Sequence, residues 1–368
     1  MTKRALLVVY SDLSRDSRVQ RHLLFLKEAG YHVDVWDHSL LFQRYNRSFR
    51  DKALFYFYLL FHPFKAYEMI FRTNSLPEEK EYDLVIANDW NALPLAFRAP
   101  LSKQGVVIYD SHEFALHQNR ESFKWRLTFP RIIRAVEKKY ISRADHVITV
   151  NEDIAGILKK IYKIPRCGVV RNIPFQRKTG PGAGRRGAGE EVRLYHHGGY
   201  IPRRRLEVIL EAVLKVNRPL SCYLRIDPAG AALLKKRFTE GNRFHYLDMV
   251  SPERLFSLEE SYDLGVVAIA PANLNYVYCL PNKFFECLFM GLPVLVTQEN
   301  RTMARYVKEH GIGFVAESFT SQSFIKLLSR LSLAEIEQKR SGVISFLKNL
   351  DERSDYKRLM DEIRKREA

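Results

Sequence analysis

Short apolar runs recur along the chain and alternate with longer stretches of helical periodicity. Residues 18–29 show helical spacing that ends at Gly30. Continuous apolar runs of this length are typical of parallel strands that are buried on both faces, with helices between them. The first half therefore predicts an α/β domain. Its predicted strands are residues 5–10, 32–36, 83–87, 106–110 and 146–150.

A second α/β half follows a break in this pattern. Residues 177–191 are rich in Gly and contain no apolar residue larger than Ala, which predicts an exposed linker. The alternation restarts at RLYHHG, and its predicted helices include residues 203–216 and 252–261. A ligand is expected between the two domains, at the carboxyl ends of the strands. We expect an N-terminal domain at 1–176, a C-terminal domain at 192–345, and a last helix at 346–368 that packs back on the N-terminal domain.

Composition narrows the class of protein. The 368 residues are 46% hydrophobic and carry a formal net charge of +17, which favours anionic partners such as nucleic acid, phosphorylated substrates or an anionic membrane. No apolar run reaches the roughly 18 residues of a membrane span, and the N-terminus lacks signal-peptide features. We therefore expect a cytoplasmic protein. The scattered cysteines predict free thiols and no zinc site; they are Cys167, Cys222, Cys279 and Cys287.

Residues 280–296, LPNKFFECLFMGLPVLV, predict a short buried helix that carries two charges. Pro281 suits its first turn and Gly291 suits its end. The free N–H groups of a helix N-terminus, together with Lys283, suit a phosphate. The carboxylate of Glu286, one turn later, suits a vicinal diol such as a ribose. The alternative is an exposed ion pair between the two charges, worth about 0.3 kcal/mol.

The run formed by Pro281, Lys283, Glu286, Gly291 and Pro293 resembles the C-terminal signature of GT-B glycosyltransferases of family 4. Members of that family are retaining enzymes that use nucleotide sugars. The resemblance implies two Rossmann-like domains with parallel sheets that face each other across a cleft. No metal is expected, because the cleft motifs contain no Asp-x-Asp pair or ligand cluster. No cofactor is expected beyond the nucleotide-sugar substrate, whose UDP, GDP or dTDP form stays open.

The resemblance also assigns residues of the donor site. Glu286 matches the glutamate that binds the nucleotide ribose, and Pro281, Asn282 and Lys283 belong to the same donor-binding segment. Tyr278 stands where the family has a first glutamate, eight residues before the second, that usually contacts the donor sugar. The identity of the sugar is therefore not implied.

Residues 195–212, YHHGGYIPRRRLEVILEA, resemble the family segment whose basic pair clamps the diphosphate. Arg204 matches the second basic position, but Gly199 stands where an arginine is common. Arg203 and Arg205 are possible substitutes, because arginine suits bidentate phosphate contacts. The alternative is a solvated helix start, although positive charge there is unfavourable without an anion.

The catalytic candidates follow two predicted strands. His112, in YDSHEF, matches a family histidine that faces the reacting sugar and phosphate, and Glu113 accompanies it. The alternative is a histidine in a surface loop. The resemblance implies no protein nucleophile, because the leaving phosphate is thought to help deprotonate the acceptor. Asp89 and Asn91, in ANDWNALPLAF, are acceptor-side candidates, but Asp89 equally suits a helix cap.

The first βα turn, SDLSRDSRV, departs from the glycine pair of many family members. Asp16 or Ser14 suits the cap of the following helix, and Arg18 is expected to face the cleft on the acceptor side. Asn172, in VVRNIP, matches the segment that closes the N-terminal domain, and we expect it to be structural.

Residues 46–74 combine an aromatic, apolar centre with basic flanks. This composition predicts an interfacial segment on an anionic membrane; the alternatives are a helical hairpin packed on the core and a dimer contact. The leading hypothesis is a retaining, metal-independent, hexosyltransferase-like enzyme that acts on a membrane-linked glycan or lipid in polysaccharide biosynthesis. Alternatives are a GT-B epimerase, a phosphorylase-like enzyme and a non-catalytic GT-B subunit. No nucleic acid partner is expected, because a lone glutamate in an apolar helix does not fit a basic, aromatic groove.

Overall fold

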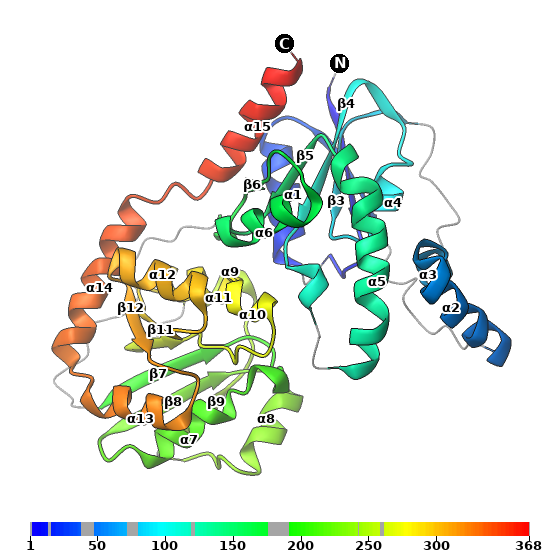
Figure 1. Ribbon diagram of the computed structural model, residues 1–368. Helices are drawn as coiled ribbons and strands as arrows, with labels where there is room; N and C mark the ends of the chain where they lie inside the picture. The colour runs from blue at the N-terminus through cyan, green and yellow to red at the C-terminus, as the bar shows by residue number, and fades with distance from the viewer. Residues whose placement is uncertain are drawn as a thin grey trace. The chain divides into compact units, whose positions relative to one another are not determined.

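The computed structural model describes residues 2–367, except for 14–15, 38–47, 72–79, 119–121, 176–190, 242 and 258–260. The chain divides into two compact units (Figure 1). Unit 1 is Met1–Arg171 with Arg353–Ala368, and unit 2 is Asn172–Glu352. Each unit has its own six-stranded sheet with helices around it. Nearly all of the predicted linker at 177–191 lies outside the described residues.

The sheet of unit 1 is entirely parallel and has the order β2-β1-β3-β4-β5-β6. Every strand predicted in the first half is present. Because the chain first builds outward through β2 and then returns to the other side of β1, the order reverses between β1 and β3. Ligands bind at such reversal points, outside the carboxyl ends of the strands. The strands are β1 (Arg4–Val9), β2 (His32–Asp37), β3 (Tyr82–Asn88), β4 (Leu101–Ser111), β5 (His146–Thr149) and β6 (Gly168–Val169).

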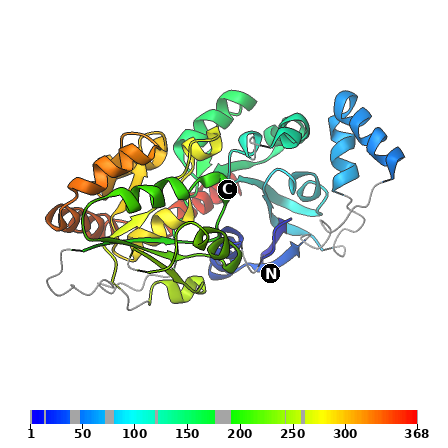
Figure 2. The ribbon, with the colours of Figure 1, turned by 90° about the horizontal axis from the view of Figure 1, so that it is seen from below.

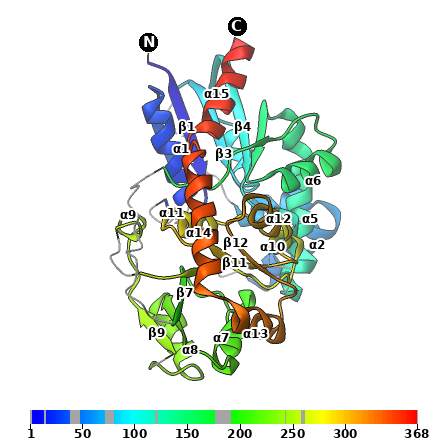
Figure 3. The same cartoon turned by 90° about the vertical axis from the view of Figure 1, so that its left-hand side faces the viewer.

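The C-terminal helix α15 packs within unit 1, beside α1 (Figure 3). The ring of Tyr356 lies 5.5 Å from that of His22 and 4.8 Å from that of Phe25. Asp355 accepts hydrogen bonds from the backbone and guanidinium of Arg171. The helices of unit 1 are α1 (Ser17–Glu28), α2 (Phe49–Phe61), α3 (Pro63–Ile70), α4 (Leu93–Ala96), α5 (Phe123–Tyr140), α6 (Glu152–Tyr162) and α15 (Ser354–Glu367).

The predicted interfacial segment contains a helical hairpin, α2–α3, at the periphery of unit 1 (Figures 1 and 2). In α3, Ala66 and Tyr67 are buried. Helix α2 is apolar around most of its circumference, yet only Phe55 and Leu59 are buried. Across the described residues, no helix combines the length and the apolar character that crossing a membrane requires.

Unit 2 has a parallel sheet of the order β12-β11-β10-β7-β8-β9, which reverses between β7 and β10. Its strands are β7 (Val192–His197), β8 (Leu220–Arg225), β9 (Phe244–Leu247), β10 (Leu264–Val266), β11 (Val294–Thr297) and β12 (Gly313–Ala316). Its helices are α7 (Glu207–Lys215), α8 (Pro228–Lys235), α9 (Pro252–Leu255), α10 (Leu274–Tyr278), α11 (Asn282–Phe289), α12 (Arg301–His310), α13 (Ser321–Arg330) and α14 (Leu333–Lys348).

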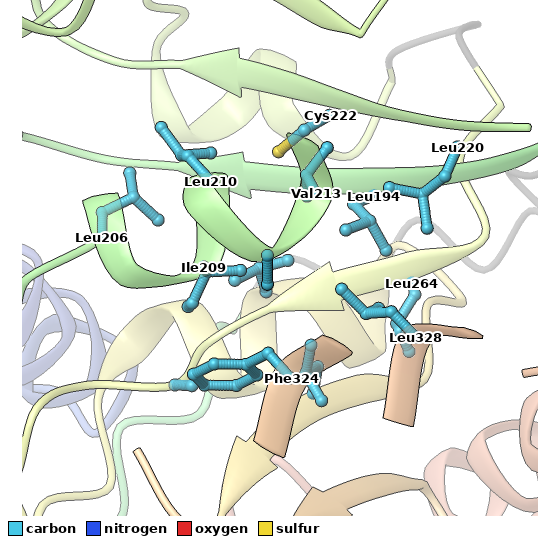
Figure 4. Packing of buried hydrophobic residues seen from close by; sticks show 14 of the residues in the cluster. Leu194, Leu206, Ile209, Leu210, Val213, Leu220, Cys222, Leu264, Phe324 and Leu328 are labelled. Carbon is cyan, nitrogen blue, oxygen red and sulfur yellow. The ribbon is translucent and has the colours of Figure 1, made fainter. Parts of the chain in front are cut away.

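One core of unit 2 lies between the sheet and helices α7 and α13 (Figure 4). The spacing of Ile209, Leu210 and Val213 gives α7 one apolar face. That face packs with Leu194 of β7 and Phe324 of α13, and all five side chains are fully buried. Such packing holds β7, and therefore the loop that follows it, in a fixed position.

Several helix boundaries differ from the sequence prediction. The last helix, expected at 346–368, spans only Ser354–Glu367, because α14 continues to Lys348. The helix expected at 203–216 begins only at Glu207, because Arg205 has a φ of 53° and interrupts the helical backbone. The basic run before it forms the separate 3-10 turn Pro202–Arg204. The helix expected at 252–261 is the single turn α9, and residues 258–260 lie outside the described part. All four cysteines are free thiols, as predicted.

Candidate functional site

Helix α11 is held at the reversal point of unit 2 by its apolar face. Phe284, Phe285 and Leu288 are fully buried. Pro281 is the N-cap, one residue earlier than the first-turn position predicted for it, and Asn282 is the first helical residue. At the other end, Gly291 has a φ of 74°, which favours glycine, and closes the helix as predicted.

Lys283 is buried in α11, with only 8% of its surface exposed. Burial, with the nearby charge of Arg204, lowers the pKa of Lys283 to about 7. Its Nζ approaches the loop after β7: a Cβ added to Gly198, whose φ is +100°, would lie 3.6 Å from Nζ. Within the described part of the chain, no carboxylate lies within ion-pairing distance of this amine. The alternative of an exposed Lys283–Glu286 pair is therefore wrong.

Glu286 instead pairs with a histidine that the sequence reasoning missed. Nε2 of His197, the last residue of β7, lies 2.8 Å from Oε2 of Glu286. The side chain of Glu286 is 19% exposed and that of His197 is 9% exposed. The only sequence signal was the HH of YHHGG, which has no motif character of its own.

The basic turn before α7 supplies a half-buried arginine. Arg204 lies beside the ring of Tyr276, with 5.9 Å between its Cζ and the ring centroid. Its Nε is buried and has no hydrogen bond among the described residues. Arg203 and Arg205 are exposed. Arg204 is thus the arginine of this turn whose charge acts on Lys283.

Tyr278, at the position of the family's first glutamate, ends helix α10. Its hydroxyl accepts a hydrogen bond of 3.2 Å from Nη1 of Arg301. Its carbonyl oxygen accepts one from the hydroxyl of Thr302. A tyrosine–arginine contact therefore stands where the family pattern has a carboxylate. Asn172, in the same unit, donates to the carbonyl of Leu280, which fits its predicted structural role.

In unit 1, the predicted residues Asp89 and His112 follow the neighbouring strands β3 and β4. Nε2 of His112 lies 3.2 Å from Oδ2 of Asp89. The other polar atoms, Oδ1 of Asp89 and Nδ1 of His112, are buried and have no hydrogen bond among the described residues. Helix α4 begins at the N-cap Ala92 with no side-chain cap. Asp89 therefore does not cap it, and that alternative is wrong.

Asp89 and His112 change each other's pKa. Burial raises the pKa of Asp89 to about 7, while His112 acts against this rise. Burial would lower the pKa of His112, but the carboxylates of Asp89, Asp110 and Asp16 raise it above its usual value. An imidazole of raised pKa next to a partly buried carboxyl is an arrangement typical of functional sites. Asn91, nearby, keeps its Oδ1 buried without a hydrogen bond in this described region.

Arg18 corrects the sequence interpretation. Its guanidinium is buried and holds Asp110 with two hydrogen bonds of 2.6 and 2.7 Å. A third bond reaches the carbonyl of Val170. Nε2 of His22 lies 2.7 Å from the same carboxylate. Arg18 therefore does not face an open acceptor site, because Asp110, which sequence reasoning did not single out, takes up its charge.

The remaining candidates have local roles. Asp16 accepts hydrogen bonds from the backbone of Arg18 and Val19 and caps α1, as predicted; Ser14 lies outside the described residues. The carboxylate of Glu113 accepts a hydrogen bond from Gln118. The described residues contain no group of three or more His, Cys, Asp or Glu side chains arranged to hold a metal ion.

One sequence profile of a protein family matches part of the chain, and solved structures share its fold. Residues 18–173 match the sequence profile of Glycosyltransferase Family 4. No curated protein sequence matches the chain.

Among solved structures, Anabaena HepE in complex with UDP and glucose is 14% identical, covers 99% of this chain and 100% of its own, and has a TM-score of 0.62. Sucrose-phosphate synthase from Thermosynechococcus elongatus is 15% identical over 93% and 94% of the two chains, with a TM-score of 0.63. A mutant of S. aureus TarM in complex with Fondaparinux, alpha-GlcNAc-glycerol and UDP is 12% identical over 76% of this chain, with a TM-score of 0.56. The match spans only 55% of the TarM chain. These likenesses confirm the predicted GT-B fold.

Proposed function

Because this chain is a glycosyltransferase of the GT-B fold with a Glycosyltransferase Family 4 domain at residues 18–173, we propose that it is a retaining enzyme. It moves a sugar from a nucleoside-diphosphate sugar to a membrane-linked glycan or lipid. The observation that carries the donor half of this proposal is the pair of charged groups on α11: a buried lysine that forms no ion pair among the described residues, and a carboxylate bonded to a histidine.

The diphosphate of the donor supplies a close anion for Lys283, which forms no ion pair within the part of the chain that the structure describes. A buried ammonium without a partner is unfavourable, which is why its pKa is lowered to about 7. A diphosphate bound at the N-terminus of α11 restores the charged lysine and also meets the helix dipole. Arg204 adds a second cation whose Nε has no hydrogen bond within the described residues. The open face of Glu286 accepts the ribose hydroxyls.

The acceptor-side chemistry belongs to unit 1. We assign His112, which is paired with Asp89, a role at the reacting sugar and phosphate. Its raised pKa favours the protonated imidazole, which stabilises negative charge on the departing diphosphate. The leaving phosphate takes the proton of the acceptor hydroxyl, so no covalent intermediate with the protein is needed. Positive side chains at the diphosphate replace a metal ion as the source of charge stabilisation.

The lipid-linked acceptor is supported by the surface of α2. Phe49 is 90% exposed, Phe57 50% and Phe61 66%. Exposed aromatic side chains on a helix with basic neighbours fit the interface of an anionic membrane, on its cytoplasmic face. Arg50 and Lys52 on α2 and Lys65 on α3 provide the positive charge.

The experiment is a binding and transfer assay on the full chain. Calorimetry with UDP-, GDP- and dTDP-sugars identifies the donor, and the complexes of HepE and TarM with UDP make UDP-sugars the first choice. Glu286→Ala is expected to abolish binding, whereas Glu337→Ala, on the exposed face of α14, is expected to leave it unchanged. NMR of the anomeric proton of the product tests retention. If no donor binds and Glu286→Ala changes nothing, the proposal is wrong. If the donor sugar is isomerised without transfer, the epimerase alternative replaces it.

A further inference from the structure

The imidazole of His197 is held by its strand and by a stacked ring. It is the last residue of β7, a strand paired on both edges with β8 and β10. Its ring stacks on that of Tyr195, with centroids 5.4 Å apart and an interplanar angle of 22°. Tyr195 is itself fully buried, stacks on Tyr262 at 4.4 Å, and accepts a hydrogen bond from Nε of Arg225. The position of the imidazole is therefore set before any ligand arrives.

The hydrogen bond of His197 defines which atom of Glu286 stays available. Nε2 lies 2.8 Å from Oε2 of Glu286, so an N–H at Nε2 donates to that oxygen. Nδ1 of His197 is buried without a hydrogen bond in the described part of the protein, so it offers no competing contact. Oε1 of the carboxylate has no hydrogen bond to the described residues, and the side chain remains 19% exposed. Oε1 and one remaining lone pair of Oε2 are thus presented in a fixed plane.

We propose that His197 is a positioning residue that orients the carboxylate of Glu286 toward a 2′,3′-diol, and that it thereby makes the donor site selective for ribonucleotides over 2′-deoxyribonucleotides. This inference rests on the proposed nucleotide-sugar function and deepens it. A carboxylate that rotates freely adapts to a single hydroxyl, whereas one held in plane loses a whole hydrogen bond when a hydroxyl is missing. A hydrogen bond to a charged group corresponds to roughly tenfold or more in affinity.

The test measures the dissociation constants of UDP and 2′-deoxy-UDP, with GDP and 2′-deoxy-GDP in parallel, by calorimetry on the full chain. The wild type is expected to prefer the ribonucleotide about tenfold. In His197→Phe, which retains a ring to stack on Tyr195 but has no N–H, UDP is expected to weaken about tenfold while 2′-deoxy-UDP changes less than about twofold. The preference then disappears. His197→Gln, whose amide N–H reaches the region of Nε2, is expected to restore it.

A purely structural role gives a different pattern, in which both nucleotides weaken by the same factor and the preference survives. That result, or an unchanged preference in His197→Phe, overturns the inference while leaving the proposed function intact. If His197→Phe does not fold, judged by its thermal transition, His197→Val replaces it with the same expected loss of preference. Tighter binding of dTDP, which has no 2′-hydroxyl, than of UDP and GDP would overturn the inference and leave the proposed function intact. Failure of dTDP and of all four other nucleotides to bind the wild type overturns the proposed function itself, and the inference with it.

Discussion

Oδ2 of Asp89 and Nε2 of His112 lie 3.2 Å apart, at the carboxyl ends of two neighbouring parallel strands. The register of β3 and β4 brings them together, because Asn88 pairs with Asp110 and each functional residue follows shortly after. Asp89 adopts a φ of 69°, a backbone conformation that is unfavourable for a residue with a side chain. Its backbone N–H donates to the carbonyl of Asp110, which holds it there. Strain of this kind is often found at functional sites.

Asp89→Asn is expected to lower the pKa of His112. The carboxylate of Asp89 is the leading influence that raises this pKa against burial, and an amide of the same shape removes its charge. NMR titration of the His112 ring protons measures the change, and the limb of the pH–rate profile that reports His112 is expected to move in the same direction. Glu152→Gln is the matched control, because this exposed carboxylate in the first turn of α6 is not among the groups that act on His112. An unchanged His112 titration in Asp89→Asn would show that the contact has no electrostatic role.

Nucleotide binding is expected to take up a proton on Lys283. In the ligand-free protein its pKa is lowered to about 7, so much of the amine is neutral at pH 8. An anionic diphosphate favours the charged form and raises this pKa. Affinity for UDP is therefore expected to fall as the pH rises above about 7, by up to tenfold per pH unit.

Calorimetry in two buffers of different ionisation enthalpy measures this proton uptake. Lys283→Met is expected to abolish the proton uptake and to weaken UDP binding. Lys215 is an exposed lysine at the end of α7, and Lys215→Met is expected to leave both the proton uptake and the affinity for UDP unchanged. Equal heats in the two buffers for the wild type would contradict the role of Lys283.

Lys283 also affects the stability of the folded protein. Because its folded pKa lies below the unfolded value, its contribution to the stability of the ligand-free protein falls as the pH drops from about 10 to 7.

Local sequence patterns were sufficient for the elements and their ends. The apolar runs identified the strands of unit 1 except the short β6, Asp16 was one of two residues expected to cap α1, and Gly291 was expected to end α11. These features depend on residues a few positions apart. The start of α7 was misjudged, because helical periodicity does not reveal that Arg205 adopts a positive φ.

The contacts that define the two sites join residues far apart in the sequence. His197 and Glu286 are 89 positions apart, and Arg18 and Asp110 are 92 apart. Their meeting depends on the strand order, which places the ends of particular strands next to each other. A single sequence gives the type of each charge but not its partner, and for that reason Arg18 was expected to be open when it is already paired.

The exposed aromatic side chains of α2 are expected to drive binding to anionic vesicles. Phe57 and Phe61 are one turn apart, with ring centroids separated by 5.1 Å, and form one apolar face. Replacing both with Ser is expected to weaken binding to phosphatidylglycerol vesicles by about tenfold or more, because each buried aromatic ring contributes about 1.5–3 kcal/mol. Vesicle co-sedimentation at low and high salt measures this, and binding is expected to decrease with salt.

Leu214→Ser with Leu233→Ser is the matched control for this variant. Both leucines are as exposed as Phe57 but lie on α7 and α8 of unit 2. Unchanged co-sedimentation of the α2 variant would contradict the membrane proposal. If the wild type instead dimerises and the α2 variant is monomeric in ultracentrifugation, the exposed face is a dimer contact.

The attachment of α15 to unit 1 is expected to depend on Asp355. Its carboxylate is 3% exposed and accepts hydrogen bonds from the backbone N–H, Nε and Nη2 of Arg171, and from Arg358. Breaking a buried charge pair by removing one partner costs about 3 kcal/mol or more, since the other charge stays without compensation. Asp355→Asn is therefore expected to reduce the hydrogen-exchange protection of the α15 amides by roughly a hundredfold.

The contribution of Asp355 to the attachment of α15 is expected to decrease at low pH. Burial acts to raise the pKa of Asp355, but the contacts with Arg171 outweigh it and lower the pKa below its usual value. Asp355 therefore stabilises the helix above about pH 4, and this contribution is lost as the pH falls through the folded pKa. In Asp355→Asn, the acid-induced loss of α15 protection should be smaller than in the wild type. Asp361→Asn, on an exposed face of the same helix, is the matched control and is expected to change stability by less than about 0.5 kcal/mol. Equal effects of the two variants would show that α15 is held by its apolar contacts alone.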